Sequence, residues 1–476
     1  MDRTMFKYGL LVLVTGIVGL LPFLFPEALP LSPIQHTVLV LFTVAALCWL
    51  LEPIPVYATS ILIISALCFM VSDSALTPVR MFFEQADKTT ELVSYKSVFN
   101  CFASPVIILF FGGFALAIGA SKYKLDANLA AFLLNPFGSN PKFIMLGLMI
   151  ITSCFSMFMS NTATTVMMLA MVMPILAFFE NKDRGIKGVI LSIPFAANIG
   201  GIATPIGTPP NAIALGYISK DHPISFFEWM SWGLPTAVVC VILSWFLLLK
   251  LFPFEQKSVT LNIKSNFSKE WRAIVVYVTF AVTILLWMTE KLHGINSYVV
   301  SLVPILVFTS ARVIKAKDIK TMNWDVVWLV AGGIALGEAL SVTGTAKVLA
   351  NVIDYSSLSP LVLVVVLGLI GWIASNFISN TATANLVMPI AMAVFVNIDF
   401  AAVGIDVDLS LIVMVLAFTM SFGMSLPIST PPNALAYASG KITNKDMVMA
   451  GGIMSLSCFI ITIVLFTQIL LLLFHS

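Results

Sequence analysis

The sequence predicts an all-α polytopic membrane protein, and three observations lead to that fold class. Of the 476 residues, 59% are hydrophobic and only 10% are charged, whereas soluble domains average about 45–50% apolar and about 25% charged residues. Apolar runs long enough to cross a bilayer recur along the whole chain. Polar motifs return in the same order in the second half of the chain. This composition excludes a soluble enzyme, a disordered chain and a disulfide-stabilised scaffold.

The charged and metal-ligating residues exclude further classes. A net charge of +2 gives no indication of a nucleic-acid partner. The four histidines are too scattered to predict a metal or proton-relay cluster, and the six cysteines form no Cys-x-x-Cys pair. No His/Asp/Glu or Cys/His constellation of a membrane enzyme is visible. We therefore expect neither an enzyme nor an organic cofactor.

Eleven apolar runs are expected to span the membrane, because a spanning helix needs about 20 mostly apolar residues. The expected spans are 8–25, 37–52, 57–72, 104–120, 188–218, 232–252, 272–290, 296–314, 326–342, 408–440 and 449–474. The first run follows Arg3 and Lys7 and has no small-residue cleavage pattern behind it. It is therefore interpreted as the first membrane helix and not as a signal peptide.

Two further apolar stretches, 142–180 and 360–397, are each interrupted in the middle by Ser-Asn-Thr-Ala-Thr. Two half-length helices that meet at a polar tip predict a re-entrant hairpin. Such backbone is tolerated at membrane depth only where protein or a water-filled cavity surrounds it. The polar segment 73–103 is expected to be an external or interfacial loop.

The distribution of positive charge predicts the orientation. If the N-terminus is cytoplasmic, the C-terminus is extracytoplasmic and both hairpins return to the side they left, most of the 25 lysines and arginines fall on the cytoplasmic side. The segment 253–271 then becomes a cytoplasmic linker. We expect a multi-pass protein of the cell inner membrane, with the lipid bilayer as its surroundings.

Three motifs recur after about 220 residues, which indicates an internal duplication. Gly112-Gly113 returns as Gly332-Gly333, Ser160-Asn161-Thr162-Ala163-Thr164 as Ser379-Asn380-Thr381-Ala382-Thr383, and Thr208-Pro209-Pro210-Asn211-Ala212 as Thr430-Pro431-Pro432-Asn433-Ala434. The expected divisions are a first transmembrane helix (1–36), repeat 1 (37–252), the linker (253–271) and repeat 2 (272–476). Five spans per repeat is an odd number, so the repeats are expected to be inverted, with a binding site near the midplane.

The interruptions supply ligands of two kinds. Free N–H groups at the start of a half-helix suit an anion, and free carbonyls at the end of a half-helix suit a cation. An asparagine at the tip can offer its oxygen to a cation and its amide to a carboxylate. Prolines break the helix again within 188–218 and within 408–440, where freed carbonyls can complete a cation site.

Ionisable groups are scarce inside the predicted spans, and Glu338 is the clearest exception. We interpret Glu338 as a structural, hydrogen-bonded residue. The scarcity favours a metal cation held by neutral oxygens over a proton relay. No basic residue is placed to bind a buried carboxylate, so cation and anion binding are expected to depend on each other.

The paired Ser-Asn-Thr motifs, the paired Pro-Pro-Asn breaks and the Glu52-Pro53-Ile54-Pro55 turn resemble the divalent anion–sodium symporter family over essentially the whole chain. The resemblance implies a homodimer in which each protomer has a scaffold domain and a transport domain. It also implies an elevator-type transporter, in which the transport domain carries the substrate across. The cargo it implies is a dicarboxylate such as succinate, malate or fumarate, with sodium ions as coupling ions.

The resemblance also implies the roles of individual residues. The first sodium site would use Ser156, Ser160, Asn161 and the backbone near Gly207, and the second would use Ser375, Ser379, Asn380 and the backbone near Ser429. The substrate would contact Asn161, Thr162, Thr208, Asn380, Thr381, Thr430 and Pro431. One departure concerns the proline after each tip. Pro389 follows the family pattern, whereas Pro174 comes about one helical turn later than its counterpart would.

The sequence thus predicts sodium-coupled symport of C4-dicarboxylates. One alternative is a sodium-independent dicarboxylate exchanger, which the intact tip asparagines and their flanking serines argue against. A second is a sodium-coupled carrier of sulfate or citrate, since relatives with such cargo use similar motifs. An anion channel is an alternative of a different class. A channel needs a continuous pore, whereas two hairpins with opposed entry suit alternating access.

Overall fold

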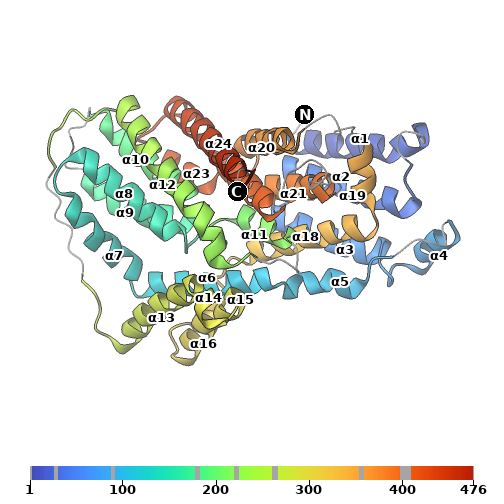
Figure 1. The fold of residues 1–476 in the computed structure, drawn as a ribbon, viewed down its shortest axis with the longest axis horizontal. Helices are drawn as coiled ribbons and strands as arrows, with labels where there is room; N and C mark the ends of the chain where they lie inside the picture. The colour runs from blue at the N-terminus through green and yellow to red at the C-terminus, as the bar shows by residue number, and fades with distance from the viewer. Residues whose placement is uncertain are drawn as a thin grey trace.

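The computed structural model describes residues 3–25, 30–86, 92–176, 179, 183–218, 224–259, 266–352, 359–396 and 409–474. These residues form an all-helical protein in which most of the long helices run roughly along one direction (Figure 1). No strand occurs among them, and their one β-bridge pairs Ser72 with Val93.

Eight helices within the described residues are long and apolar enough to cross a bilayer. They are Met5–Leu24, Pro33–Leu51, Tyr95–Lys122, Phe226–Leu251, Trp271–Met288, Trp324–Val342, Pro360–Phe377 and Asn444–Gln468. Seven of these helices correspond to expected spans, whereas Pro360–Phe377 is the first arm of the expected hairpin 360–397 and is longer than the half-length helix predicted there. The other four expected spans are shorter or broken. Val56–Met70 is a short apolar helix, and Ser301 separates α15 (Ser297–Val300) from α16 (Leu302–Ser310). The fold class is therefore that of a multi-pass helical membrane protein.

Both Ser-Asn-Thr stretches separate two helices that pack against each other. The pairs are α8 (Pro141–Ser156) with α9 (Asn161–Leu176), and α20 (Pro360–Phe377) with α21 (Asn380–Val396). The first helix of each pair starts at a proline behind a capping side chain, Asn140 or Ser359. Pro174 lies inside α9 and Pro389 inside α21. Residues 177, 178, 180 and 397 of the two expected hairpins lie outside the described residues.

The two proline-rich stretches also break the helix. The breaks separate α10 (Gly185–Gly201) from α11 (Pro209–Tyr217), and α22 (Leu409–Ser421) from α23 (Pro431–Ala438). Residue 408 of the second expected broken helix lies outside the described residues. An asparagine side chain satisfies the freed carbonyls in each break. Asn211 Nδ2 donates to the carbonyls of Gly201 at 3.1 Å and Thr204 at 2.8 Å. Asn433 Nδ2 donates to those of Met424 at 2.9 Å and Leu426 at 3.0 Å.

Close helix contacts occur at both copies of the Gly-Gly motif. A side chain at Gly112 of α6 (Pro105–Lys122) would place its Cβ 2.7 Å from the Cβ of Ser301, and one at Gly332 of α18 (Trp324–Val342) would lie 2.4 Å from the Cβ of Ser60 in α3 (Val56–Met70). Only glycine permits these approaches, as small residues do between membrane helices generally. They set the positions of α6 and α18.

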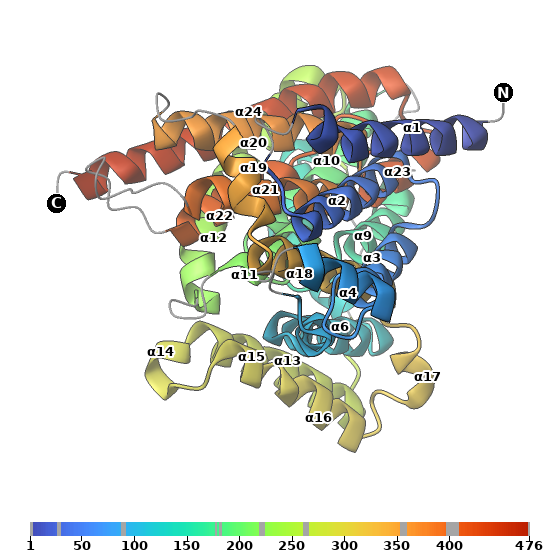
Figure 2. The ribbon, with the colours of Figure 1, turned by 90° about the vertical axis from the view of Figure 1, so that its right-hand side faces the viewer.

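The other helices complete the molecule. α13 (Trp271–Met288), α14 (Glu290–His293), α15, α16 and α17 (Ala316–Ile319) form a layer beneath α6 (Figure 2). The helices α2 (Pro33–Leu51), α12 (Phe226–Leu251) and α24 (Asn444–Phe474) pack against the core, and α1 (Arg3–Leu24) packs against α2 at the outside. Among the described residues, six short helices were not expected. They are α14 and α17, together with α4 (Thr77–Ala86) and α5 (Tyr95–Asn100) within the segment 73–103, α7 (Leu125–Leu134) and α19 (Thr345–Val352). One-turn 3₁₀ helices follow α5 and α7 at Cys101–Ala103 and Asn135–Phe137.

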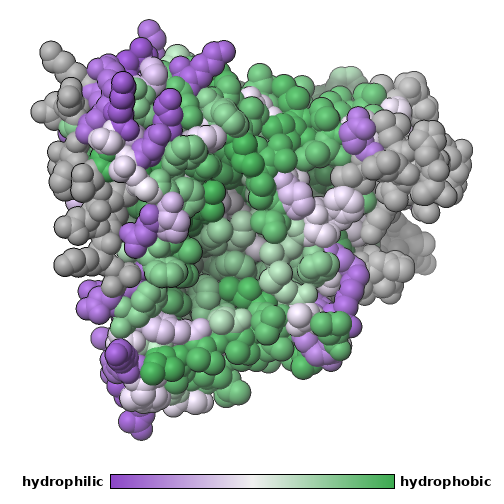
Figure 3. All heavy atoms as spheres, turned by 60° about the vertical axis from the view of Figure 1, so that its left-hand side comes forward, coloured by the Kyte–Doolittle hydropathy of each residue, from purple (hydrophilic) through white to green (hydrophobic). Residues whose placement is uncertain are grey.

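Hydrophobic residues cover a broad area of the surface, and hydrophilic residues gather along the left edge, with smaller groups toward the right-hand side (Figure 3). Such a surface suits a protein that lies across a bilayer. The described part of the linker 253–271 is not helical before Trp271. Asp183 holds it by accepting hydrogen bonds from the N–H groups of Glu255 and Gln256, at 3.2 and 3.1 Å. Linker residues 260–265 lie outside the described residues.

Candidate functional site

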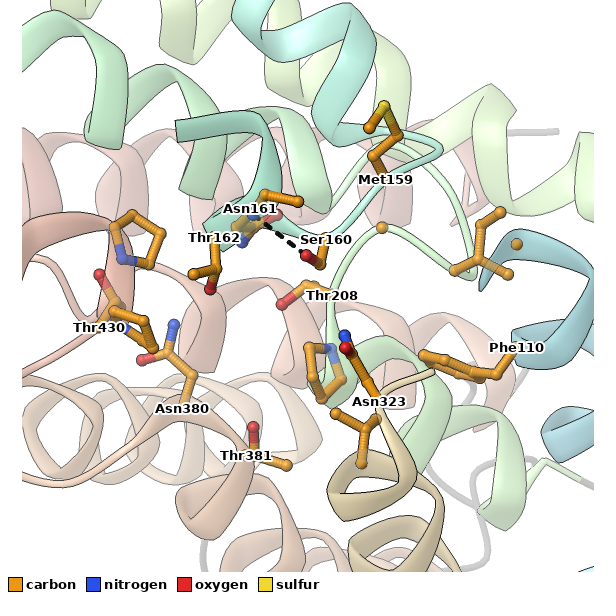
Figure 4. A pocket seen from close by; sticks show the side chains of 18 of the residues that line it. Phe110, Met159, Ser160, Asn161, Thr162, Thr208, Asn323, Asn380, Thr381 and Thr430 are labelled. Carbon is orange, nitrogen blue, oxygen red and sulfur yellow. Dashed lines mark hydrogen bonds between the residues drawn. The ribbon is translucent and has the colours of Figure 1, made fainter. Parts of the chain in front are cut away.

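A cavity of about 650 Å³ lies where the two hairpin tips and the two helix breaks meet. In Figure 4, Thr162 and Thr208 face Asn380 and Thr381 across this space. All seven residues expected to contact a substrate line the cavity, namely Asn161, Thr162, Thr208, Asn380, Thr381, Thr430 and Pro431. Of the residues expected to bind cations, Ser160, Asn161, Gly207, Ser379, Asn380 and Ser429 line it as well, whereas Ser156 and Ser375 lie behind the tips.

Four helices begin at the cavity wall. α9 starts at Asn161 and α21 at Asn380, and the N-caps of α11 and α23 are Thr208 and Thr430, both with extended backbones. The N-terminus of a helix carries positive partial charge and free N–H groups. Free N–H groups therefore face the cavity at the starts of α9 and α21, whereas α11 and α23 each begin with two prolines, which have no N–H.

Oxygen atoms cluster around the side chain of Asn161 at the first tip. Ser156 Oγ lies 2.6 Å from Asn161 Oδ1 and 2.7 Å from the carbonyl oxygen of Ala197. The same end of the Asn161 amide lies 3.3 Å from the Ala197 carbonyl and 3.1 Å from the Gly207 carbonyl. When Oδ1 of Asn161 is at this end of the amide, its neighbours are the oxygen atoms of Ser156, Ala197 and Gly207. Neutral oxygens that converge in this way suit a hard cation.

Two glycines bring the backbone against this cluster. A Cβ at Gly201 would lie 2.8 Å from Asn161 Oδ1, and a Cβ at Gly207 would lie 2.4 Å from the Gly201 carbonyl oxygen. Neither position has room for a side chain. The glycines let the break between α10 and α11 fold closely around the first tip.

The second tip is arranged differently. Asn380 Nδ2 donates to the Ser421 carbonyl at 3.1 Å, and the buried Asn380 Oδ1 has no hydrogen-bond partner among the described residues. Ser375 Oγ donates to the carbonyl of Trp372 in its own helix at 2.9 Å. Ser429 Oγ donates to the Asn376 carbonyl at 2.7 Å. The unpaired oxygen of Asn380 is the feature of this tip that leaves a ligand position open.

Sequence reasoning missed Asn198, which joins the two halves of the site. It lies in α10, lines the cavity and is only 1% exposed. Its Nδ2 donates to Thr430 Oγ1 at 3.2 Å and to Asn433 Oδ1 at 3.3 Å, and its Oδ1 accepts from Asn161 Nδ2 at 3.4 Å. A search for repeated motifs could not find it, because the matching position of the second repeat is Met420.

The remaining wall was also missed, because distant segments supply it. Its residues come from α3, α6 and the start of α18, and they are Val56, Phe110, Gly113, Phe114, Ala117, Asn323, Asp325, Val326 and Leu329. Among the described lining residues, Asp325 carries the one formal charge and there is no lysine, arginine or histidine. The described residues also contain no group of three or more His, Cys, Asp or Glu side chains that could hold a metal ion.

Glu338 lies away from the described cavity wall. Its Oε1 accepts a hydrogen bond from Ser97 Oγ at 2.9 Å, which ties α18 to α5. This contact agrees with the interpretation of Glu338 as a hydrogen-bonded structural residue.

Comparisons with known proteins give both sequence and structural likeness. A family model described as citrate transporter matches residues 46–418. The sodium-dependent dicarboxylate transporter SdcS of Staphylococcus aureus strains MW2 and NCTC 8325 is 30% identical over 467 residues, which covers 90% of this chain and 84% of that protein.

Two solved transporters share the fold at 12% sequence identity. The YdaH transporter of Alcanivorax borkumensis has a TM-score of 0.56 over 78% of this chain and 86% of that chain. MtrF of Neisseria gonorrhoeae, described as illuminating a class of antimetabolite efflux pumps, has a TM-score of 0.53 over 86% of this chain and 94% of that chain.

Proposed function

The chain belongs to the divalent anion–sodium symporter family, and from that premise we propose that it imports C4-dicarboxylates such as succinate, malate and fumarate together with sodium ions. The protein is a secondary transporter of this family and not an enzyme. The observation that carries the proposal is the neutral oxygen cluster at Asn161, placed beside a cavity that four helix N-termini face.

The first sodium ion would lie among Asn161 Oδ1, Ser156 Oγ and the Gly207 carbonyl oxygen. This set supports the proposal because the atoms already lie within about one coordination sphere of each other, as hard cations require. The Ala197 carbonyl adds a fourth oxygen at the same place. Ser160 contributes less directly, since its Oγ caps α9 by accepting from the Ala163 N–H at 3.2 Å.

The second sodium ion would use the unpaired Asn380 Oδ1 with the backbone around Ser429. A buried amide oxygen without a partner is costly, and a cation would remove that cost. Ser375 would have to turn from Trp372 to reach this ion. Ser379 Oγ caps α21 by accepting from the Ala382 N–H at 3.2 Å, as Ser160 does at the other tip.

The substrate carboxylates would contact the side chains between the tips. Thr162 and Thr381 offer hydroxyl donors, and the backbone N–H groups at the starts of α9 and α21 add charge complementarity. Thr208, Thr430 and Pro431 complete the wall. Since no described lining residue is basic, the two sodium ions would supply the positive charge that the dianion needs.

The elevator mechanism belongs to the same proposal. The transport domain would contain the two hairpins, the two broken helices, α12 and α24, and the scaffold would contain the other helices. Glycine contacts between α6 and α16 and between α3 and α18 support a compact scaffold. Inverted repeats 37–252 and 272–476, a homodimer, a cytoplasmic N-terminus and an extracytoplasmic C-terminus complete the arrangement that we propose.

A citrate carrier is the second candidate, and the match to the citrate transporter model favours it. Citrate has a third carboxylate, which would need further donors or a further cation in a cavity without described basic residues. Sulfate carriage, sodium-independent exchange and an anion channel are the remaining alternatives. The experiment below separates all of them.

The test is uptake of labelled succinate into proteoliposomes, with an inward sodium gradient or with choline in place of sodium. Sodium-dependent uptake above empty liposomes is the expected result. Uptake that ignores sodium but needs internal dicarboxylate would replace symport with exchange. Competition of labelled uptake by citrate or sulfate would identify the other cargoes, and conductance in planar bilayers above carrier turnover would identify a channel.

Site variants test the ligand assignment in the same assay. Asn161→Ala and Asn380→Ala each remove an oxygen shared by cation and substrate, so each is expected to abolish most sodium-dependent uptake. Lys257→Ala is the matched control, because Lys257 is exposed on the linker and touches neither tip. Normal sodium dependence in both asparagine variants would overturn the assignment.

A further inference from the structure

Asn198 forms a polar connection between the first cation site and the substrate cavity. We propose that Asn198 is a positioning residue that transmits the occupancy of the first sodium site to the hydroxyl group of Thr430. The inference rests on the proposed function, since it concerns how sodium and dicarboxylate binding are linked. Its basis is a chain of side-chain hydrogen bonds from Asn161 through Asn198 to Thr430 and Asn433.

The amide of Asn161 has two orientations with different hydrogen bonds. In one, Oδ1 faces Ser156 Oγ and the carbonyls of Ala197 and Gly207, and Nδ2 donates to Asn198 Oδ1. In the other orientation, Nδ2 takes the position that Oδ1 had beside Ser156. It then donates to Ser156 Oγ at 2.6 Å, to the Gly207 carbonyl at 3.1 Å and to the Ala197 carbonyl at 3.3 Å. A sodium ion among these oxygens stabilises the first orientation, and the second satisfies the same oxygens without an ion.

The second orientation turns the oxygen of Asn161 toward Asn198 Oδ1. Two acceptors cannot pair, so Asn198 must rotate and offer its nitrogen to Asn161. Its oxygen then faces Thr430 and Asn433. Asn433 cannot follow, because its own nitrogen is held by the carbonyls of Met424 and Leu426, so its oxygen stays toward Asn198 and cannot pair with the rotated Asn198 oxygen. The Thr430 hydroxyl is then the donor that this oxygen needs.

Thr430 changes its role with this rotation. When Asn198 Nδ2 donates to Thr430 Oγ1, that oxygen also accepts from the Asn433 N–H at 3.3 Å. Both acceptor positions are then filled, and the hydroxyl proton is free to donate to a carboxylate in the cavity. When Asn198 presents its oxygen instead, Thr430 donates its proton to Asn198 and loses it for the substrate.

The second repeat has no such relay. Its matching residue, Met420, is buried and has no amide to rotate. This connection therefore links substrate binding to the occupancy of the first sodium site and not to that of the second. The two helix breaks otherwise match, so the polar Asn198 and the apolar Met420 are a clear difference between them.

The experiment measures succinate binding to the purified full-length protein over a series of sodium concentrations. The test variants are Asn198→Leu, which has a similar shape, and Asn198→Met, which introduces the residue of the second repeat. Asn385→Leu is the control, because Asn385 is buried in α21 and neither of its side-chain polar atoms has a hydrogen-bond partner among the described residues. Sodium binding without succinate and the melting temperature are recorded for each protein.

In the wild type, succinate affinity is expected to rise with sodium. In both Asn198 variants no side-chain oxygen takes the Thr430 hydroxyl proton, so succinate affinity at low sodium should rise by about twofold to tenfold, the equivalent of one hydrogen bond. Affinity at saturating sodium and sodium binding alone should stay within about twofold of wild type, so the coupling between the ligands falls. Asn385→Leu should keep the full coupling.

Four results would overturn the relay. An equal loss of affinity at all sodium concentrations would make Asn198 a packing residue, as would failure of both variants to fold. Wild-type coupling in folded Asn198 variants would show that the two sites communicate by another route, while the proposed function stands. A wild-type protein whose succinate binding ignores sodium would overturn the proposed function and this inference together.

Discussion

Replacing Gly201 with alanine tests the first cation site at its tightest point. The added Cβ would lie 2.8 Å from Asn161 Oδ1 and 3.1 Å from the Gly207 carbonyl oxygen. Both atoms are proposed sodium ligands. The methyl group must therefore either push these oxygens away or fill the place that the ion would take.

The expected size of the effect follows from the loss of one oxygen ligand. A hydrogen bond to a charged group contributes about 1.5–3 kcal/mol, and a lost sodium ligand is taken to cost a similar amount. This corresponds to a change of about 10- to 150-fold in an affinity. Alanine favours a helix interior by about 0.5–1 kcal/mol over glycine, and Gly201 is the last residue of α10, where the gain is smaller. That gain offsets only part of the clash, so the main loss should appear in sodium binding.

The assay is succinate uptake into proteoliposomes as a function of external sodium. Gly201→Ala should raise the half-saturating sodium concentration by about 10- to 150-fold. Gly452→Ala in α24 is the matched control, because a Cβ there meets no atom within 4 Å. A folded Gly201→Ala protein with wild-type sodium dependence would refute the position of the ion between Asn161 and Gly207.

Three further predictions concern the surroundings of the site. Asn211→Leu removes the donor for the Gly201 and Thr204 carbonyls, so the variant should be less stable than wild type. Each unpaired carbonyl costs about 1–3 kcal/mol, and a melting temperature within 1–2 °C of wild type (about 0.5 kcal/mol) would contradict this. Glu338→Gln keeps an acceptor for the neighbouring serine hydroxyl, so uptake should stay within about twofold of wild type, and loss of sodium dependence would give Glu338 a role in transport. Burial raises the pKa of Asp318, but the hydrogen bonds from Lys122 and a backbone N–H outweigh it and hold that pKa below its ordinary value. The ion pair therefore stabilises the fold above about pH 4 and is lost as the pH falls through the lowered pKa. Asp318→Asn should lower stability by about 1 kcal/mol or less at pH 7 and match wild type in strong acid, whereas a stability difference that persists in strong acid would exclude titration of this pair.

The helix breaks could be predicted from the sequence because their causes are local. Prolines at 209–210 and 431–432 cannot continue a helix, and each Ser-Asn-Thr tip interrupts an apolar run with short polar side chains. The structure places helix ends at all four positions. The cavity lining could be expected for the same reason, since each break provides free backbone groups that need partners.

Asn198 and the scaffold wall could not be predicted in this way. Asn198 lies in the middle of an apolar run, and its partners Thr430 and Asn433 are more than 230 residues away along the chain. Its function depends on a packing contact that no local pattern encodes. Phe110 and Asn323 line the cavity only because the glycines of α6 and α18 let those helices pack closely with their neighbours.

The balance of charges in the cavity decides between obligatory coupling and leakage in the proposed mechanism. Removing each charge of a dianion from water costs several kcal/mol when it is uncompensated. One helix N-terminus returns about 0.3–1 kcal/mol at usual exposure, so the two with free N–H groups, at α9 and α21, return about 0.6–2 kcal/mol. This is less than the cost for two carboxylates, and Asp325 in the wall adds a further negative charge, while no lysine or arginine occurs among the described lining residues to supply the difference. Two cations would supply it, and each would in turn be stabilised by the dianion. In the proposed mechanism, a fixed arginine in the wall would bind the dicarboxylate without sodium and let it cross alone. The described lining residues include no basic residue, and this absence would tie the movement of the substrate to that of the ions.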